Sequence, residues 1–175
     1  ISIYPEYNLL KKFVSNHYYE SRQFDSEEIG LFNGADAAIN AIFNSFGERD
    51  EIFLTTNPTF GYYSPCSEIQ GMRKITCTYE GENFLIPIKR VKEKIIEHKT
   101  KLIFICNPNN PTGTVLSAQE IIKLANLNKK SLIVVDELYE KFNGDSLLPV
   151  IDFKKIKNIV VIQSLSKTAG LAGLR

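Results

Sequence analysis

The stretch LIFICNPNNPTG, residues 102–113, constrains the fold most strongly, because it joins an apolar run to a turn that stops the run. Its first five residues are apolar without polar alternation, which is typical of a strand covered on both faces. LIVVD, residues 132–136, has the same pattern, and the segment 117–130 between the two runs has helical periodicity. Ser117 with Glu120 three residues later is a capping-box pattern, which marks a helix start.

The alternation of apolar runs and helical patterns continues from end to end of the chain. Further helices are expected at residues 6–20, 35–46 and 88–98, strands at 29–34, 51–56, 72–79 and 158–164, and a turn at 57–65. Buried strands with helices between them predict an α/β fold, a mostly parallel, doubly wound sheet with helices on both faces. Such sheets bind ligands beyond the carboxyl ends of their strands, so polar residues at those ends are candidate site residues.

Length and composition fit one soluble globular domain. The 175 residues are 43% hydrophobic and 23% charged, which supplies enough apolar side chains for a sizeable core. The formal net charge of +1 disfavours a nucleic-acid-binding surface. The basic run at 89–101 carries Val91 and Ile95 at helical spacing, which favours a solvated helix face over a phosphate-binding patch. The sequence contains no apolar run of membrane-spanning length, so no membrane partner is expected.

The cysteines indicate a reducing environment. Cys66, Cys77 and Cys106 show no CxxC spacing, and each has apolar or aromatic neighbours. This pattern is typical of reduced, partly buried thiols in a cytoplasmic protein and not of a disulfide scaffold or a zinc site. No metal site is predicted.

The first candidate site segment is FNGADAAIN, where the chain passes through Gly34 into a helix that begins near Ala35. Free backbone N–H groups at a helix start bind phosphate, and a glycine lets the chain approach a ligand closely. Asp36 is ambiguous, because an acidic residue in the first turn also favours the helix by itself. An ordinary capped helix is the alternative interpretation of this segment.

Two further strand ends carry polar side chains. In CNPNNPTG, two prolines exclude helix, so Asn107, Asn109 and Asn110 project from a stiff turn. The alternative is that this turn only punctuates the fold. In VVDELYEKF, Asp136 ends a buried strand, where an acid is costly unless it meets a cation or a hydrogen-bond donor, and Tyr139 follows three residues later. Here the alternative is an N-cap aspartate with a packed tyrosine.

The last segment, SLSKTAGLAGLR, places Lys167 between Ser164 and Ser166 directly after a buried strand. A partly desolvated lysine near another cation has a lowered pKa and becomes a usable amine nucleophile. Arg175 offers a bidentate fork for a phosphate, and the small residues of GLAGL let the chain bend back. Together, the four segments supply the groups that pyridoxal phosphate requires: an amine, a carboxylate, a phenol, an amide and a phosphate site.

NPNNPTG, DELY and SLSKTAGLAGLR, in that order, resemble the class I and II aminotransferases of the fold-type I pyridoxal-phosphate enzymes. Within them the chain is most similar to the histidinol-phosphate aminotransferase branch, through NGAD, PTFGYYS and LSKTAGLAGLR. The resemblance covers nearly the whole chain. It implies that residues 1–175 are a partial large cofactor-binding domain, and that an amino-terminal arm and a carboxyl-terminal small domain are absent from this chain.

The resemblance also implies a role for each motif residue. Lys167 would form the Schiff base, Asp136 would pair with the pyridine nitrogen, and Tyr139 with Asn110 would hydrogen-bond the phenolic oxygen. Phe60 would stack on the ring, with ordinary packing as the alternative. The phosphate would be held by Gly34, Ala35, Asp36, Ser164, Ser166 and Arg175. Asp36 departs from the hydroxyl residue often found at its position, and we expect it to act through its N–H.

Three functions remain open on this basis. The leading one is an aminotransferase that moves an amino group between an amino acid, expected to be glutamate, and an oxo acid or a phosphorylated ketone such as imidazole acetol phosphate. The second is a decarboxylase of a phosphorylated amino acid on the same scaffold. The third is a non-catalytic sensor domain of a transcription regulator. The family resemblance further implies a homodimer.

Overall fold

The fold is built on one sheet of parallel strands. The computed structural model describes residues 6–17, 24–142 and 146–173, and their sheet has five strands in the order β2-β1-β3-β4-β5. All four neighbouring pairs are parallel. The strands are β1 (Ile52–Asn57), β2 (Arg73–Thr78), β3 (Leu102–Cys106), β4 (Leu132–Asp136) and β5 (Ile159–Ile162). Because the strands are parallel, their carboxyl ends share one edge of the sheet.

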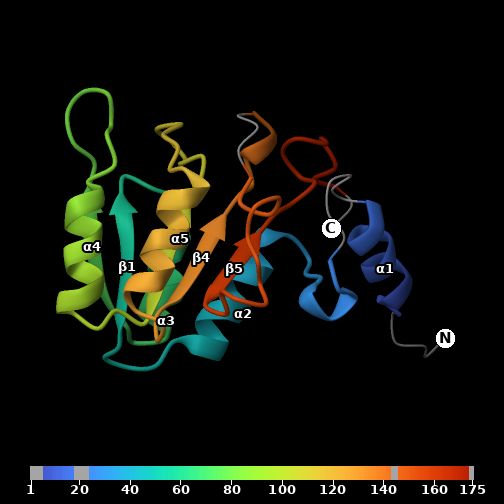
Figure 1. The fold of residues 1–175 in the computed structure, drawn as a ribbon, viewed down its shortest axis with the longest axis horizontal. Helices are drawn as coiled ribbons and strands as arrows, with labels where there is room; N and C mark the ends of the chain where they lie inside the picture. The colour runs from blue at the N-terminus through green and yellow to red at the C-terminus, as the bar shows by residue number, and fades with distance from the viewer. Residues whose placement is uncertain (1–5, 18–23, 143–145, 174–175) are drawn as a thin grey trace.

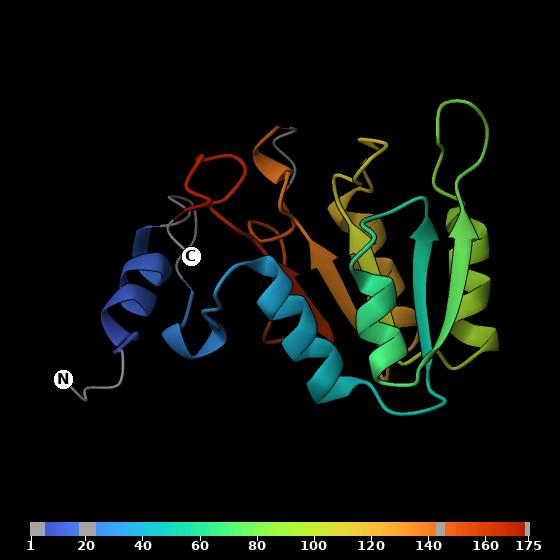
Figure 2. The same ribbon diagram turned by 180° about the vertical axis from the view of Figure 1, so that it is seen from behind.

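Helices cover both faces of this sheet. Figure 1 shows α4 and α5 in front of the strands, and Figure 2 shows α2 and α3 on the opposite face, whereas α1 lies beside the sheet, beyond β5. This arrangement confirms the predicted doubly wound α/β fold. None of the described helices is long and apolar enough to cross a membrane. The helical segments are α1 (Asn8–His17), η1 (Ser26–Glu28), α2 (Ala35–Phe46), α3 (Tyr63–Ile69), α4 (Ile88–Glu97), α5 (Ala118–Leu127) and η2 (Glu140–Phe142).

Three aromatic rings fix α2 against the sheet. Phe43 of α2 stacks on Phe104 of β3 with ring centroids 4.7 Å apart, and both rings meet Phe53 of β1 edge-on at 5.1 and 5.7 Å. All three side chains are fully buried. Offset and edge-on pairs of this kind add to the free energy of burial. The packing holds the amino-terminal end of α2 at the carboxyl edge of the sheet.

Two parts of the sequence-based prediction are wrong. Residues 29–34, predicted as a strand, form none in the described structure, because the Gly34 N–H donates to the Phe32 carbonyl at 2.9 Å and turns the chain, and the Phe32 side chain is 52% exposed. The predicted turn at 57–65 contains the start of α3. Pro65 is compatible with that helix because it lies in the first turn, where its missing N–H has no helical partner to lose.

The remaining elements agree with their predicted positions, apart from residues 18–20 of the first predicted helix, which lie outside the described residues. Ser117 caps α5 by accepting a hydrogen bond from the Glu120 N–H at 3.3 Å, as the capping-box pattern indicates. The Glu120 carboxylate instead pairs with Lys92 of α4 at 3.0 Å, so it joins the two helices on that face. Cys66, Cys77 and Cys106 are free and buried, as predicted.

We predict that Phe43→Ala lowers the free energy of unfolding by about 3–5 kcal/mol, because it removes one ring from a fully buried cluster. Phe46→Ala is the matched control on the same helix. Its side chain is 46% exposed, and it should cost about 1 kcal/mol or less. Urea unfolding of both variants measures the difference. Equal losses would contradict the assignment of the aromatic cluster as the contact that holds α2.

Candidate active site

A cavity of about 280 Å³ opens at the carboxyl edge of the sheet. Its wall is formed by the start of α2, the ends of β3 and β4, the turn before α3 and the segment after β5. The structure thus brings together every predicted site residue except Arg175, which lies outside the described residues. The predicted residues that line the cavity are Gly34, Ala35, Asp36, Phe60, Asn110, Asp136, Tyr139, Ser164, Ser166 and Lys167.

Asp136 is the buried charge of this cavity. Its side chain is 2% exposed, and its carboxylate accepts hydrogen bonds from the Tyr63 hydroxyl at 2.6 Å and from the Leu138 N–H at 3.2 Å. Burial raises the pKa of the Asp136 carboxyl, the two hydrogen bonds lower it, and the nearby charge of Asp36 raises it. Burial therefore makes the ionised form of Asp136 less stable, and a cation in the cavity would stabilise it.

Tyr63 is the site residue that the sequence analysis missed. It is fully buried in the first turn of α3, and burial followed by the charge of Asp136 raises the pKa of its phenol well above the usual value. Its ring also meets that of Phe60 edge-on, with centroids 5.5 Å apart. Tyr63 thereby braces two predicted cofactor-contacting residues at once. Helical periodicity does not reveal these contacts, because Phe60 lies outside α3 and Asp136 is 73 residues away in the sequence.

The amino terminus of α2 forms the opposite wall. Gly34 adopts φ 83° and ψ 167°, a conformation that is essentially restricted to glycine, and it leads directly into the helix at Ala35. The first N–H groups of a helix have no partner within it, and they attract anions. Asp36 lies in this first turn and lines the cavity with them.

Only one of the three asparagines in the 107–113 turn lines the cavity. The Asn107 side chain donates to the Leu116 carbonyl at 3.0 Å and accepts from the Leu116 N–H at 2.8 Å. The Asn109 side chain accepts from the Thr59 hydroxyl and donates to the Pro58 carbonyl and the Thr112 hydroxyl. These two side chains hold the turn, and Asn110 remains directed to the cavity. The turn therefore both ends the strand β3 and contributes Asn110 to the site.

The segment after β5 brings the predicted amine to the cavity. The Ser164 hydroxyl accepts from the Ser166 N–H at 3.1 Å and lies 2.9 Å from the Ser166 hydroxyl oxygen. Lys167 lines the same cavity, but its side chain is exposed. The prediction of a partly desolvated lysine is therefore not met by the described residues, because the segment extends past the end of the sheet.

Cys106 lines the cavity, although the sequence analysis did not place it there. Burial, with the charge of Asp136 as the next cause, raises the pKa of its thiol to about 12. The thiol is therefore neutral near pH 7, and it forms an inert part of the cavity wall.

The comparisons with known proteins agree with this geometry. The sequence model of the family described as aminotransferase class I and II matches residues 2–175. A histidinol-phosphate aminotransferase of Caldanaerobacter subterraneus subsp. tengcongensis is 37% identical over 149 residues, which are 85% of this chain and 41% of that protein. One from Clostridium novyi is 35% identical and covers 98% of this chain and 46% of its own length. The chain thus spans about half the length of the curated relatives it matches.

Solved structures share the fold. Histidinol-phosphate aminotransferase from Sinorhizobium meliloti, in complex with pyridoxal-5'-phosphate, superposes with a TM-score of 0.81 at 22% identity, over 95% of this chain and 44% of that one. Apo-BacF from Bacillus subtilis superposes with a TM-score of 0.83 at 26% identity, over 97% of this chain and 45% of that one.

We predict that Tyr63→Phe destabilises the protein by about 1–3 kcal/mol at neutral pH, because Asp136 loses a buried donor. Loss of that donor raises the pKa of Asp136 in the folded variant, so the difference from the wild type should shrink as the pH falls and Asp136 becomes protonated. Urea unfolding at pH about 8 and about 5 measures both effects, with Tyr62→Phe as the control. A loss that is equal at the two pH values would contradict the role of Tyr63.

Proposed function

This chain belongs to the class I and II aminotransferase family, and from that premise we propose that the protein is an aminotransferase that uses pyridoxal 5'-phosphate. The observation that carries the proposal is that one cavity is lined by the amine of Lys167, the buried carboxylate of Asp136 and the amino terminus of α2. These three groups match an aldehyde, a ring nitrogen and a phosphate.

The residues present fit this cofactor. The cavity volume of about 280 Å³ lies close to the lower end of the range of roughly 300–1,000 Å³ typical of small-molecule sites. The Asp136 carboxylate is buried, and its hydrogen-bond partners among the described residues, Tyr63 and Leu138, carry no positive charge, which suits a protonated pyridine nitrogen. At the other wall, the glycine-specific conformation of Gly34 leaves room for a phosphate at the helix start.

Two groups of residues would bind the cofactor, and the first would hold its phosphate. Gly34, Ala35 and Asp36 would hold the phosphate through backbone groups, together with the hydroxyls of Ser164 and Ser166. Arg175 is proposed as a further phosphate ligand from its motif alone, because it lies outside the described residues.

A second group would orient the ring. Asp136 would keep the ring nitrogen protonated, while Tyr63 holds the carboxylate in place at 2.6 Å. Tyr139 and Asn110 would donate to the phenolic oxygen, and the Phe60 ring would lie against the pyridine. When bound, pyridoxal phosphate supplies an aldehyde and a conjugated ring that accepts electrons. Lys167 would bond to the cofactor through Nζ and move a proton at that atom.

For the substrates, we propose glutamate as the amino donor and a phosphorylated ketone such as imidazole acetol phosphate as the acceptor. The support is that curated relatives at 35–37% identity are named histidinol-phosphate aminotransferases. Cytoplasmic location is proposed on the three free, buried thiols.

A homodimer is proposed as the working form of the protein. The apolar surface of α1 supports this, because Leu9 is 81% and Leu10 is 49% exposed on a helix that lies beside the sheet. Sedimentation equilibrium of the intact protein tests the dimer, and a monomer mass would contradict it.

We predict that the intact protein with pyridoxal phosphate shows the visible absorption band of the lysine-bound cofactor. Glutamate without an acceptor should convert that band to the amino form of the cofactor. Lys167→Ala should abolish the band, whereas Lys123→Ala, a change on the exposed side of α5, should leave it unchanged.

The other outcomes separate the alternatives. A band that glutamate leaves unmoved, together with release of carbon dioxide from a phosphorylated amino acid, would replace the proposal with a decarboxylase. Absence of any band in the wild-type protein would contradict cofactor binding.

A further inference from the structure

Glu137 is a buried carboxylate that the proposed function does not use. Its side chain is 1% exposed, although it follows Asp136 directly at the carboxyl end of β4. Burial raises the pKa of the Glu137 carboxyl, three hydrogen-bond donors lower it, and the nearby charge of Glu140 raises it. A buried acid needs such partners, so the identity of the donors shows what the side chain holds.

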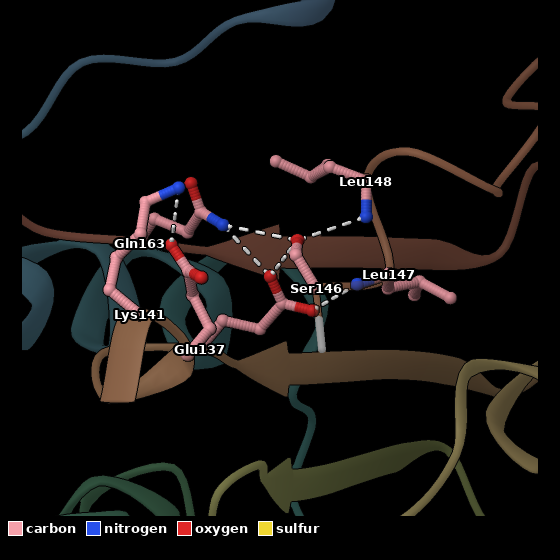
Figure 3. Close-up of polar contacts among 7 residues, drawn as sticks. Glu137, Lys141, Ser146, Leu147, Leu148 and Gln163 are labelled. Atoms are coloured by element: carbon pink, nitrogen blue, oxygen red, sulfur yellow. Dashed lines mark hydrogen bonds and ion pairs between the residues drawn. The ribbon is translucent and has the colours of Figure 1, made fainter. Parts of the chain in front are cut away.

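The three donors come from two different segments (Figure 3). One carboxylate oxygen accepts from the Leu147 N–H at 2.6 Å. The other accepts from the Ser146 hydroxyl at 2.6 Å and from the Gln163 side-chain amide at 2.8 Å. The Ser146 hydroxyl oxygen in turn accepts from the Leu148 N–H at 3.1 Å. Because the hydrogen-bond partners of the Glu137 carboxylate are all donors, the network is matched to an ionised carboxylate.

This network lies behind the cavity. Val134 and Ile162 belong to the core cluster on the α2 side, and Val135 belongs to the cluster on the α4 side. Side chains alternate between the faces of a strand, so Asp136 and Ser164 point toward the cavity and Glu137 and Gln163 point away from it. The pair Glu137–Gln163 thus joins the ends of β4 and β5 on the face opposite the site.

Gln163 is the junction between the sheet and the segment that carries the amine. The Glu137 N–H extends the strand pairing by donating to the Ile162 carbonyl at 2.8 Å. Beyond that point, the hydrogen bonds of residues 164–173 with other described residues stay within the segment. They join Ser166 to Ser164 and Leu171 to Leu165. The position of Lys167 therefore depends on how residue 163 is held.

We propose that Glu137 is a positioning residue that, through Gln163, sets where Ser164, Ser166 and Lys167 stand relative to Asp136. The proposal rests on the proposed function, since only that function gives Lys167 a partner in the cavity. The Glu137 side chain does not line the cavity, so it acts through Gln163. A side chain that only braced residues 146–148 would leave the Lys167 segment unaffected when removed.

The first test uses hydrogen–deuterium exchange of the full-length protein without cofactor. Glu137→Ala should speed exchange at residues 163–167 by at least about 10-fold, because Gln163 loses its side-chain hydrogen bond to Glu137. Ser117→Ala, which removes the cap of α5, is a control that should leave these amides unchanged. Unchanged exchange at 163–167 in Glu137→Ala would overturn the proposal.

The second test exchanges the two partners. Gln163→Glu places two carboxylates together and should speed exchange at 163–167, whereas Glu137→Gln/Gln163→Glu restores one carboxylate and one amide and should return it to within about 2-fold of wild type. Glu137→Gln alone should also stay near wild type, because Ser146 and Gln163 are each able to reverse donor and acceptor roles. A double variant as impaired as Gln163→Glu would overturn the direct contact, even if Glu137→Ala fails to fold.

The third readout is the rate at which pyridoxal phosphate bonds to Lys167. Misplacement of the amine in Glu137→Ala should slow this rate by about 10- to 100-fold, and the swapped double variant should recover it. A wild-type protein that bonds no cofactor would refute the proposed function, while the exchange measurements would still decide whether Glu137 holds the segment. A normal rate in Glu137→Ala would overturn the positioning role.

Discussion

The Asp136 carboxylate, buried at the carboxyl end of β4, is the constraint on which the site depends. A charge in this position is stable only with donors around it, and the fold supplies them from the Tyr63 hydroxyl and the Leu138 N–H. Tyr63 occupies that position because α3 packs on the same face of the sheet as α2. The Asp136 carboxylate is therefore connected through Tyr63 to α3, and the Tyr63 ring also contacts the ring of Phe60.

Two successive acids at the carboxyl end of β4, Asp136 and Glu137, have opposite environments. Asp136 faces the cavity, where a cationic ring would complete its surroundings, whereas Glu137 faces away and is satisfied by the protein's own donors. Successive side chains of a strand point to opposite faces of the sheet, so two adjacent residues meet different surroundings. The side that Asp136 faces is thus available for a ligand. On the opposite side, Glu137 and Gln163 join the ends of β4 and β5.

The sequence predicted the parts of the fold that depend on local pattern. LIFIC and LIVVD lack polar alternation because both of their faces are covered, and they are the buried strands β3 and β4. The motif residues at strand ends converge for the same reason, since parallel strands end at one edge. Tyr63 was missed because Gly61 and Pro65 around it indicated a turn. Exposure of Lys167 and the absence of a strand at 29–34 depend on what lies beside each segment in space, which periodicity does not report.

The most direct test of the central claim is the identity of the residue that binds the cofactor. The intact protein, incubated with pyridoxal phosphate, is reduced with borohydride and digested, and the peptides are analysed by mass spectrometry. We expect a phosphopyridoxyl group on Lys167, with cofactor binding weakened in Asp136→Ala. A label on another lysine, such as Lys157, or a label unaffected by Asp136→Ala would contradict it.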